Sequence, residues 1–254
     1  MDTFRQWHEG TETELKFHNE SRLYFCQCDA RHKLSLFELL RLATDTAVED
    51  YRQRGMSWQF LAERGIAILV SRQSFRFHRL PEANARITIS TWEEAPQPLQ
   101  LMRTYEITDT DSGERLVSGR AAWMVVDVQS RRIVRAKDFT LRAPPTISTD
   151  HDCLPPGKIT VPERMAPLAE RPICYSDIDG NGHMNNARYG AFVMDCLPPE
   201  YRQKDFTDFR INYSKEAVCG GQLTLSGAFD DEGRKIVLSG TQDGATCFEA
   251  ELFY

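Results

Sequence analysis

The chain has 254 residues, of which 41% are hydrophobic and 27% charged, and its formal net charge is −6. This composition is typical of a soluble globular protein with one large domain or two ordinary ones, and the acidic balance argues against a nucleic-acid partner. The sequence has no apolar signal run, no stretch near the ~20 apolar residues of a membrane span, and seven cysteines without a C-x-x-C pair. We therefore expect reduced thiols, a cytoplasmic location and no membrane span.

The first part of the chain predicts a long amphipathic helix. Residues 1–20 are polar and expected to be peripheral, and residues 22–28 are expected to form a strand. Ser35 is a candidate N-cap with Glu38 three residues later, which is the pattern of a capping box. Apolar residues at helical spacing follow, so the sequence predicts a helix over 35–54 with one apolar face that another element must cover.

Four strands are predicted to provide that cover. β-branched and aromatic residues dominate the segments 65–80, 83–95, 99–110 and 114–129. Strands in unbroken succession after one helix indicate an antiparallel sheet packed on that helix.

The second half of the chain repeats this pattern after a proline-rich segment. Residues 171–176 read as a strand, 186–197 as a helix, and four more strands are predicted within 206–218, 221–230, 234–243 and 246–254. Residues 85–91 resemble 221–227, and 74–80 resemble 210–216, which indicates an internal duplication of one α+β unit. We expect a first domain over 1–145, an ordered linker over 146–166 and a second domain over 167–254.

The densest set of reactive side chains precedes the second helix. Asp177, Asp179, Asn181 and His183 occupy alternate positions, and in an extended segment such residues share a face. Asn185 or Asn186 is a candidate cap for the following helix, whose free N–H groups and partial positive charge suit a developing oxyanion.

This segment has two other interpretations. Asp and Asn in a glycine-rich turn can simply shape the turn. The start also matches an EF-hand calcium loop, but the position that needs a glutamate holds Arg188 and the segment before the loop resembles a strand. We therefore expect no metal and no cofactor.

Five motifs in order resemble those of a known family. They are residues 28–47, the strand that ends at 89–92, and residues 113–135, 177–186 and 211–218. Together they resemble the acyl-acyl carrier protein thioesterases of plants and bacteria. The resemblance implies an α+β fold with two tandem hotdog units, each a long helix wrapped by a curved antiparallel sheet.

The same resemblance implies the site residues. The family's Asp, Asn, His and Glu fall on Asp179, Asn181, His183 and Glu216, the last expected on a strand. Plant members have a cysteine directly after that glutamate, but this chain has Ala217, and Cys219 is out of register. A carboxylate mechanism is therefore favoured over a cysteine nucleophile.

The first repeat supports the assignment of the site to the second. Its turn keeps Asp29 and His32 but lacks the alternating pattern, and Leu80 occupies the position that matches Glu216. We expect the first copy to be apolar and, as in the family, to hold most of the acyl chain.

The implied function is hydrolysis of fatty acyl-acyl carrier protein, which releases free fatty acid and ends chain elongation. An acyl-CoA thioesterase, a hotdog dehydratase and a non-catalytic acyl-binding protein are the alternatives, and a homodimer stays open. Asp179 or Glu216 would act through water, or Asp179 would attack directly, with Asn181 holding the water or thioester and His183 moving protons. The carrier is acidic, so its candidate docking surface is the densest basic cluster, namely Arg131, Arg132, Arg135, Lys137 and Arg142.

Overall fold

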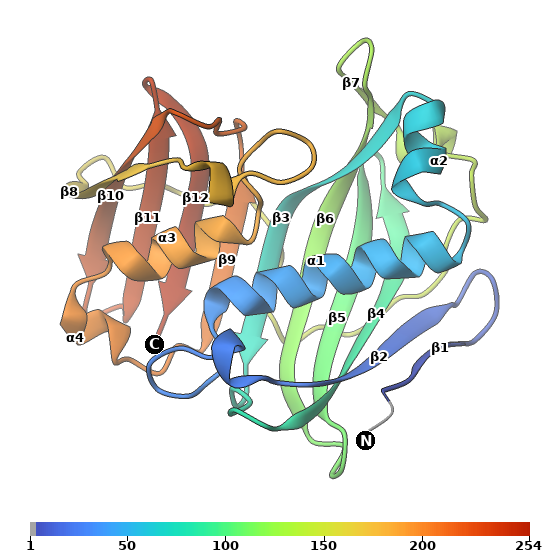
Figure 1. Ribbon diagram of the computed structural model, residues 1–254, viewed down its shortest axis with the longest axis horizontal. Helices are drawn as coiled ribbons and strands as arrows, with labels where there is room; N and C mark the ends of the chain where they lie inside the picture. The colour runs from blue at the N-terminus through green and yellow to red at the C-terminus, as the bar shows by residue number, and fades with distance from the viewer. Residues whose placement is uncertain (1–3) are drawn as a thin grey trace.

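The computed structural model, which describes residues 4–254, is a strongly curved antiparallel sheet with its two main helices on one face (Figure 1). The strand order is β1-β2-β4-β5-β6-β3-β9-β12-β11-β10-β8, and β7 pairs with β6 at one side. We call the face covered by helices α1 (Leu36–Gln53) and α3 (Arg188–Cys196) the inner face. The predicted α+β architecture, with two helices each wrapped by antiparallel strands, is confirmed.

The remaining elements follow the chain in two series. The first half contains β1 (Gln6–Glu9), β2 (Lys16–Arg22), α2 (Trp58–Glu63), β3 (Ile66–Phe77), β4 (Arg86–Gln97), β5 (Gln100–Asp109), β6 (Arg115–Asp127) and β7 (Arg132–Val134). The second contains β8 (Ala166–Pro172), α4 (Pro199–Arg202), β9 (Asp208–Tyr213), β10 (Gln222–Asp230), β11 (Lys235–Gln242) and β12 (Ala245–Phe253).

The N-terminal segments differ in part from the prediction. The described part of 1–20 lies at the edge of the sheet, where it forms β1 and β2. The strand predicted over 22–28 is wrong apart from Arg22, the last residue of β2, because a 3₁₀ turn, Phe25–Gln27, follows, in which the Gln27 side chain accepts a hydrogen bond from the backbone N–H of Tyr24. The strand expected at 171–176 likewise ends at Pro172, and a 3₁₀ turn, Tyr175–Asp177, follows it.

The two halves join through strands and helices alike. Strand β3 pairs with β9 around Ser74 and Arg210, so the sheet runs without interruption from one half to the other. On the inner face α1 and α3 approach closely at Gly190, where an added Cβ would lie 2.9 Å from the Leu40 side chain. A larger residue there would therefore push the two helices apart.

The inner face of the first half is more polar than the sequence predicts. Arg103 of β5 is almost fully buried and lies 2.9 Å from Asp50 of α1, while Glu93 and Arg142 are buried beside them. This buried ion cluster corrects the expectation of a purely apolar first copy. Alternation of charged and apolar residues along the strands did not reveal that the charged side chains face inward, where each is paired.

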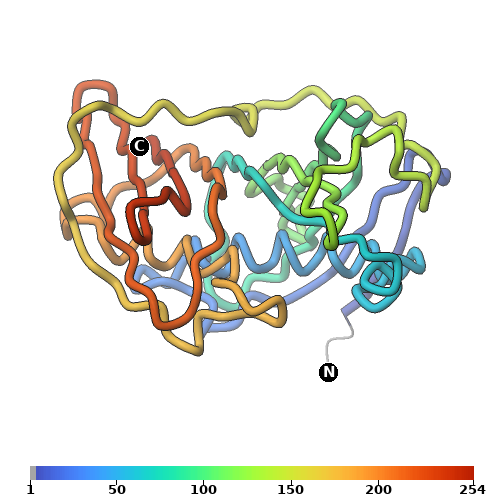
Figure 2. Tube along the Cα trace, turned by 90° about the horizontal axis from the view of Figure 1, so that it is seen from above, coloured from blue at the N-terminus to red at the C-terminus, as the bar shows by residue number. Residues whose placement is uncertain are grey.

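The segment between Asp138 and Ala166 contains no helix or strand and crosses the sheet on the side away from the helices (Figure 2). Side chains fix it there, since Trp92 Nε1 donates to Thr149 Oγ1 at 3.0 Å and His151 Nε2 lies 2.7 Å from Glu94. The boundaries of a linker at 146–166 stay a prediction. None of the described helices is both long and apolar enough to cross a membrane.

Candidate active site

The segment with the alternating polar residues forms a tight turn rather than an extended strand. Ile178 and Met184 pair across its base, and the backbone N–H of Asp179 donates to the carbonyl of His183 at 2.9 Å. Gly182 has a φ of +83°, a conformation that glycine adopts without steric cost. The turn therefore brings Asp179 and His183 to adjacent positions at its base and leaves Asn181 exposed at its tip.

His183 and Glu216 form the one direct contact between predicted site residues from different segments. His183 Nε2 lies 3.2 Å from Glu216 Oε2, and the two side chains are 37% and 59% exposed. Glu216 does not lie on a strand as predicted, because β9 ends at Tyr213. A hydrogen bond of 2.9 Å from Met184 N–H to the Ala217 carbonyl holds the two segments together.

Asp179 and Asn181 are joined within the turn itself. Asp179 Oδ1 accepts the backbone N–H of Asn181 at 2.8 Å, which leaves its second oxygen available. Within residues 4–254 the side-chain amide of Asn181 forms no hydrogen bond.

Asp177 has a structural role. Its carboxylate is buried and accepts hydrogen bonds from the backbone N–H of Cys174 and from the Arg188 guanidinium. The first member of the alternating pattern thus anchors the start of the turn to helix α3, as the turn-shaping interpretation proposed for such residues.

The start of α3 offers a free donor. Asn185 Oδ1 accepts the N–H of Ala187 at 2.8 Å in the turn before the helix, but the N-cap of α3 is Ala187, so the prediction that Asn185 or Asn186 caps this helix is wrong. The backbone N–H of Asn186 finds no acceptor among the described residues. This N–H lies in the turn just before Ala187, the N-cap of α3, and a free N–H near the positive end of a helix suits an oxygen that gains negative charge during a reaction.

Three further polar residues that the sequence analysis missed lie beneath the turn. Tyr213 Oη donates to Gln73 Oε1 at 2.8 Å and lies 3.3 Å from the Asn186 carbonyl. Tyr189 packs edge-on against Tyr213, and burial raises the pKa of the Tyr189 hydroxyl, with smaller contributions from Cys247 and from the Glu216 and Asp179 carboxylates. Comparison of the two repeats could have singled out these tyrosines, because the positions equivalent to Tyr213 and Tyr189 hold Phe77 and Leu39.

The described residues contain no group of three or more His, Cys, Asp or Glu side chains placed to hold a metal ion. Cys219 is exposed in the turn after Glu216, whereas Ala217 is fully buried. The groups that surround the turn are thus carboxylates, amides, an imidazole and phenols, which suit proton transfer and stabilisation of an oxyanion.

Comparisons with known proteins agree over most of the chain. A family model described as the acyl-ACP thioesterase N-terminal domain matches residues 14–142, and one described as the C-terminal domain matches residues 166–248. A chloroplastic palmitoyl-acyl carrier protein thioesterase from Cuphea hookeriana is 23% identical over 174 residues, which cover 64% of this chain and 40% of that protein. A chloroplastic oleoyl-acyl carrier protein thioesterase 2 from Arabidopsis thaliana is 23% identical over 52% of this chain and 39% of its own length.

Solved structures share the fold over almost the whole chain. An acyl-ACP thioesterase from Bacteroides thetaiotaomicron VPI-5482 has a TM-score of 0.78 at 22% identity and covers 94% of this chain and 97% of its own. The 12:0-ACP thioesterase from Umbellularia californica also has a TM-score of 0.78, at 15% identity, with 94% and 96% covered. The two halves of the chain match the two family models in order, and the chain belongs to the acyl-ACP thioesterase family.

Proposed function

We propose that this chain hydrolyses the thioester of a fatty acyl group carried by an acyl carrier protein, releasing free fatty acid and ending chain elongation. The observation that carries the proposal is the contact between His183 and Glu216 in a member of the acyl-ACP thioesterase family. Both side chains are partly exposed, so a thioester delivered from outside by a carrier can reach them.

The reaction requires a nucleophile, a site for the oxyanion and a proton for the leaving thiolate. Asp179 or Glu216 takes a proton from a water molecule, whose oxygen forms the new bond to the thioester carbon. The Asn186 N–H holds the oxyanion, and His183 carries the proton to the sulfur as the carbon–sulfur bond breaks. Asn181 holds the water or the thioester, and Asp179 is the alternative base or a direct nucleophile.

The docking hypothesis needs one correction. Arg142 does not belong to a basic surface, because its side chain is buried and paired with Glu93. The remaining basic residues of the predicted cluster lie on β7 and directly before and after it, and docking of the acidic carrier there stays a prediction. All seven cysteines are free, which supports the proposed cytoplasmic location. A homodimer also stays a prediction.

The experiment is a measurement of thiol release from acyl-carrier protein and acyl-CoA substrates with the same acyl chain. We expect steady-state hydrolysis of both, with a higher kcat/KM for the carrier-bound thioester because the carrier adds contacts. Equal kcat/KM values would favour an acyl-CoA thioesterase. Binding without thiol release would favour a non-catalytic acyl-binding protein, and loss of water from a 3-hydroxyacyl thioester would favour a dehydratase.

A further inference from the structure

Buried polar atoms without a hydrogen-bond partner gather in the first half of the molecule. Among the described residues, every such side-chain atom belongs to a residue between 18 and 142, and they include Gln73 Nε2, Arg103 Nε and Tyr105 Oη. A buried donor or acceptor without a partner costs free energy, so native proteins pair such groups with protein, water or a ligand.

Gln73 and Arg103 lie on the same face of the sheet. Gln73 pairs with Ala121 across β3 and β6, and Ala121 pairs with Arg103 across β6 and β5, so the three side chains point to one side of the sheet. Since Arg103 contacts Asp50 of α1, that side is the inner face. The side chain of Gln73 is completely buried on this face, next to the small side chain of Ala121.

Gln73 is also joined to the candidate active site. Its Oε1 accepts the Tyr213 hydroxyl at 2.8 Å, and the same hydroxyl lies 3.3 Å from the carbonyl of Asn186, whose N–H would hold the thioester oxygen. The bond to Tyr213 fixes the orientation of the amide, so Nε2 with its two N–H groups is directed elsewhere in the buried space. The amide that carries the unpaired donor is thus connected to the backbone of Asn186 through the single hydroxyl of Tyr213.

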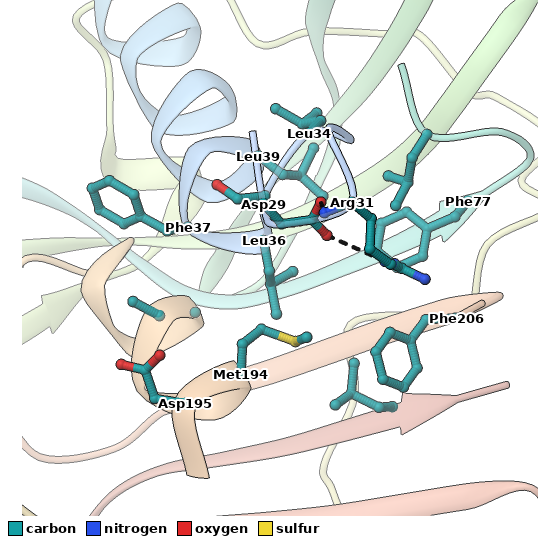
Figure 3. Close-up of a pocket in the computed structure, with 15 residues that line it drawn as sticks. Asp29, Arg31, Leu34, Leu36, Phe37, Leu39, Phe77, Met194, Asp195 and Phe206 are labelled. Atoms are coloured by element: carbon teal, nitrogen blue, oxygen red, sulfur yellow. Dashed lines mark hydrogen bonds and ion pairs between the residues drawn. The ribbon is translucent and has the colours of Figure 1, made fainter. Parts of the chain in front are cut away.

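The equivalent place in the other half shows that the fold does not require this polarity. Phe209 and Phe77 occupy the positions equivalent to Gln73 and Tyr213, and the neighbouring cavity of about 280 Å³ is mostly apolar (Figure 3). Its lining includes Leu36, Phe77, Met194 and Phe206, and the ion pair of Asp29 with Arg31 lies at its edge. Apolar side chains therefore occupy both positions equivalent to Gln73 and Tyr213.

We propose that the acyl site accepts acyl thioesters that carry an oxygen on carbon 3 of the acyl group, and that Gln73 Nε2 donates a hydrogen bond to that oxygen. The inference rests on the proposed thioesterase function. Two carbon–carbon bonds separate the thioester carbonyl from carbon 3. This short separation agrees with a donor on Gln73, which is connected to Asn186 through the single hydroxyl of Tyr213. Carbon–carbon condensation of two thioesters leaves an oxygen at that carbon, so 3-oxoacyl and 3-hydroxyacyl groups are the substrate class. An unsubstituted chain leaves the Gln73 donor unpaired.

The test compares thiol release from three carrier thioesters of equal chain length: the unsubstituted acyl, the 3-hydroxyacyl and the 3-oxoacyl group. For the wild-type chain we expect kcat/KM to be about 10- to 100-fold higher for an oxygenated substrate than for the unsubstituted one. In Gln73→Leu this ratio falls to about one. Phe209→Leu changes the equivalent position of the other half and keeps the wild-type ratio.

Stability separates this role from a structural one. Leucine removes an unpaired buried amide, so we expect Gln73→Leu to melt at the wild-type temperature or above it. Gln73→Met provides a second apolar variant of similar length if leucine fails to fold. A wild-type ratio near one, or a ratio that survives in Gln73→Leu, overturns the inference while leaving thioester hydrolysis in place. Absence of hydrolysis with all three substrates overturns the proposed function as well.

Discussion

The turns before α1 and α3 can be compared residue by residue, because the backbone repeats its hydrogen bonds. Asp29 N–H donates to the Lys33 carbonyl at 2.7 Å, as Asp179 N–H donates to the His183 carbonyl at 2.9 Å. In both turns the aspartate Oδ1 also accepts the backbone N–H two residues later. The backbone of the turn therefore does not depend on the chemistry of its side chains beyond the conserved position of one aspartate in each copy.

The side chains around that common backbone differ. Arg31 stands where the second copy has Asn181, and it binds the carbonyls of Gln203 and Lys204 and the carboxylate of Asp205. Leu80 stands where the second copy has Glu216, so the first turn has no carboxylate to meet a histidine. One copy uses the turn to fasten the loop between α4 and β9, and the other copy leaves it open for chemistry.

The largest expected difference between the two turns concerns their aspartates. We expect Asp179→Asn to fold normally and to lose about 10²- to 10⁴-fold in kcat for thioester hydrolysis, because an amide is neither a base nor a useful nucleophile. The matched control is Asp29→Asn, which should keep wild-type turnover. In each variant the asparagine Oδ1 can still accept the N–H two residues later, so the turn is preserved.

Two results would change this assignment. Near-native turnover by Asp179→Asn would remove Asp179 from the mechanism and leave the His183–Glu216 pair to activate water. An acyl group trapped on Asp179 and detected by mass spectrometry would establish the nucleophilic route in place of the water route.

The sequence predicted the architecture of these turns better than their details. Helical spacing after Ser35 and before Cys196 located both helices within two residues, because an apolar stripe and a cap are local signals. The internal match also aligned Leu80 with Glu216. Period-two spacing suggested an extended ladder, but Gly182 and the pairing of Ile178 with Met184 produce a turn.

The contributions of Gln73 and Tyr213 could not be predicted from local pattern. Each lies on a strand whose alternation is compatible with either face, and their meeting depends on the pairing of β3 with β9 across the two halves. The inward charges of Arg103 and Glu93 were missed for the same reason, since burial of paired charges follows from tertiary packing.

Loss of a buried charge in the first half should cost more stability than loss of an exposed one. Arg103→Met removes a buried cation from Asp50 and Glu93, so we expect the free energy of unfolding to fall by about 3–5 kcal/mol. Urea unfolding at pH 7 measures it. The control is Arg79→Met, which breaks an exposed pair with Glu114 and should change stability little. A small loss in Arg103→Met would mean that water or the other arginines compensate.

The same cluster predicts a dependence of stability on pH. Burial opposes ionisation of Glu93, yet Arg103 and Arg142 hold the pKa of its carboxyl below the ordinary 4.5. A carboxyl whose pKa is lowered by folding stabilises the protein above its unfolded pKa and loses that contribution as pH falls through the folded value. We therefore expect wild-type stability to decline below about pH 4.5, and less steeply in Glu93→Gln.

A smaller effect separates Arg31 from Asn181. Arg31→Ala removes the hydrogen bonds to the loop between α4 and β9, so we expect a loss of about 1 kcal/mol in unfolding free energy. Hydrolysis should persist because this turn has no proposed catalytic group. Asn181→Ala should show the opposite pattern, with unchanged stability and lower kcat. Loss of activity in Arg31→Ala at full stability would instead indicate that the first turn contributes to the reaction.

The smallest expected effect is that of Cys219. This cysteine is exposed in the turn after Glu216, while the position next to the glutamate is the buried Ala217. A catalytic thiolate needs a nearby cation or helix start to lower its pKa, and the sequence neighbours of Cys219 are Val218 and Gly220. We therefore expect Cys219→Ala to hydrolyse an acyl-carrier thioester within about twofold of wild type, whereas Glu216→Ala loses at least about 10²-fold. Any inhibition by thiol alkylation should then reflect blocked access and be absent in Cys219→Ala. If Cys219→Ala lost several orders of magnitude with its fold intact, the carboxylate mechanism would be wrong and a thiol nucleophile would replace it.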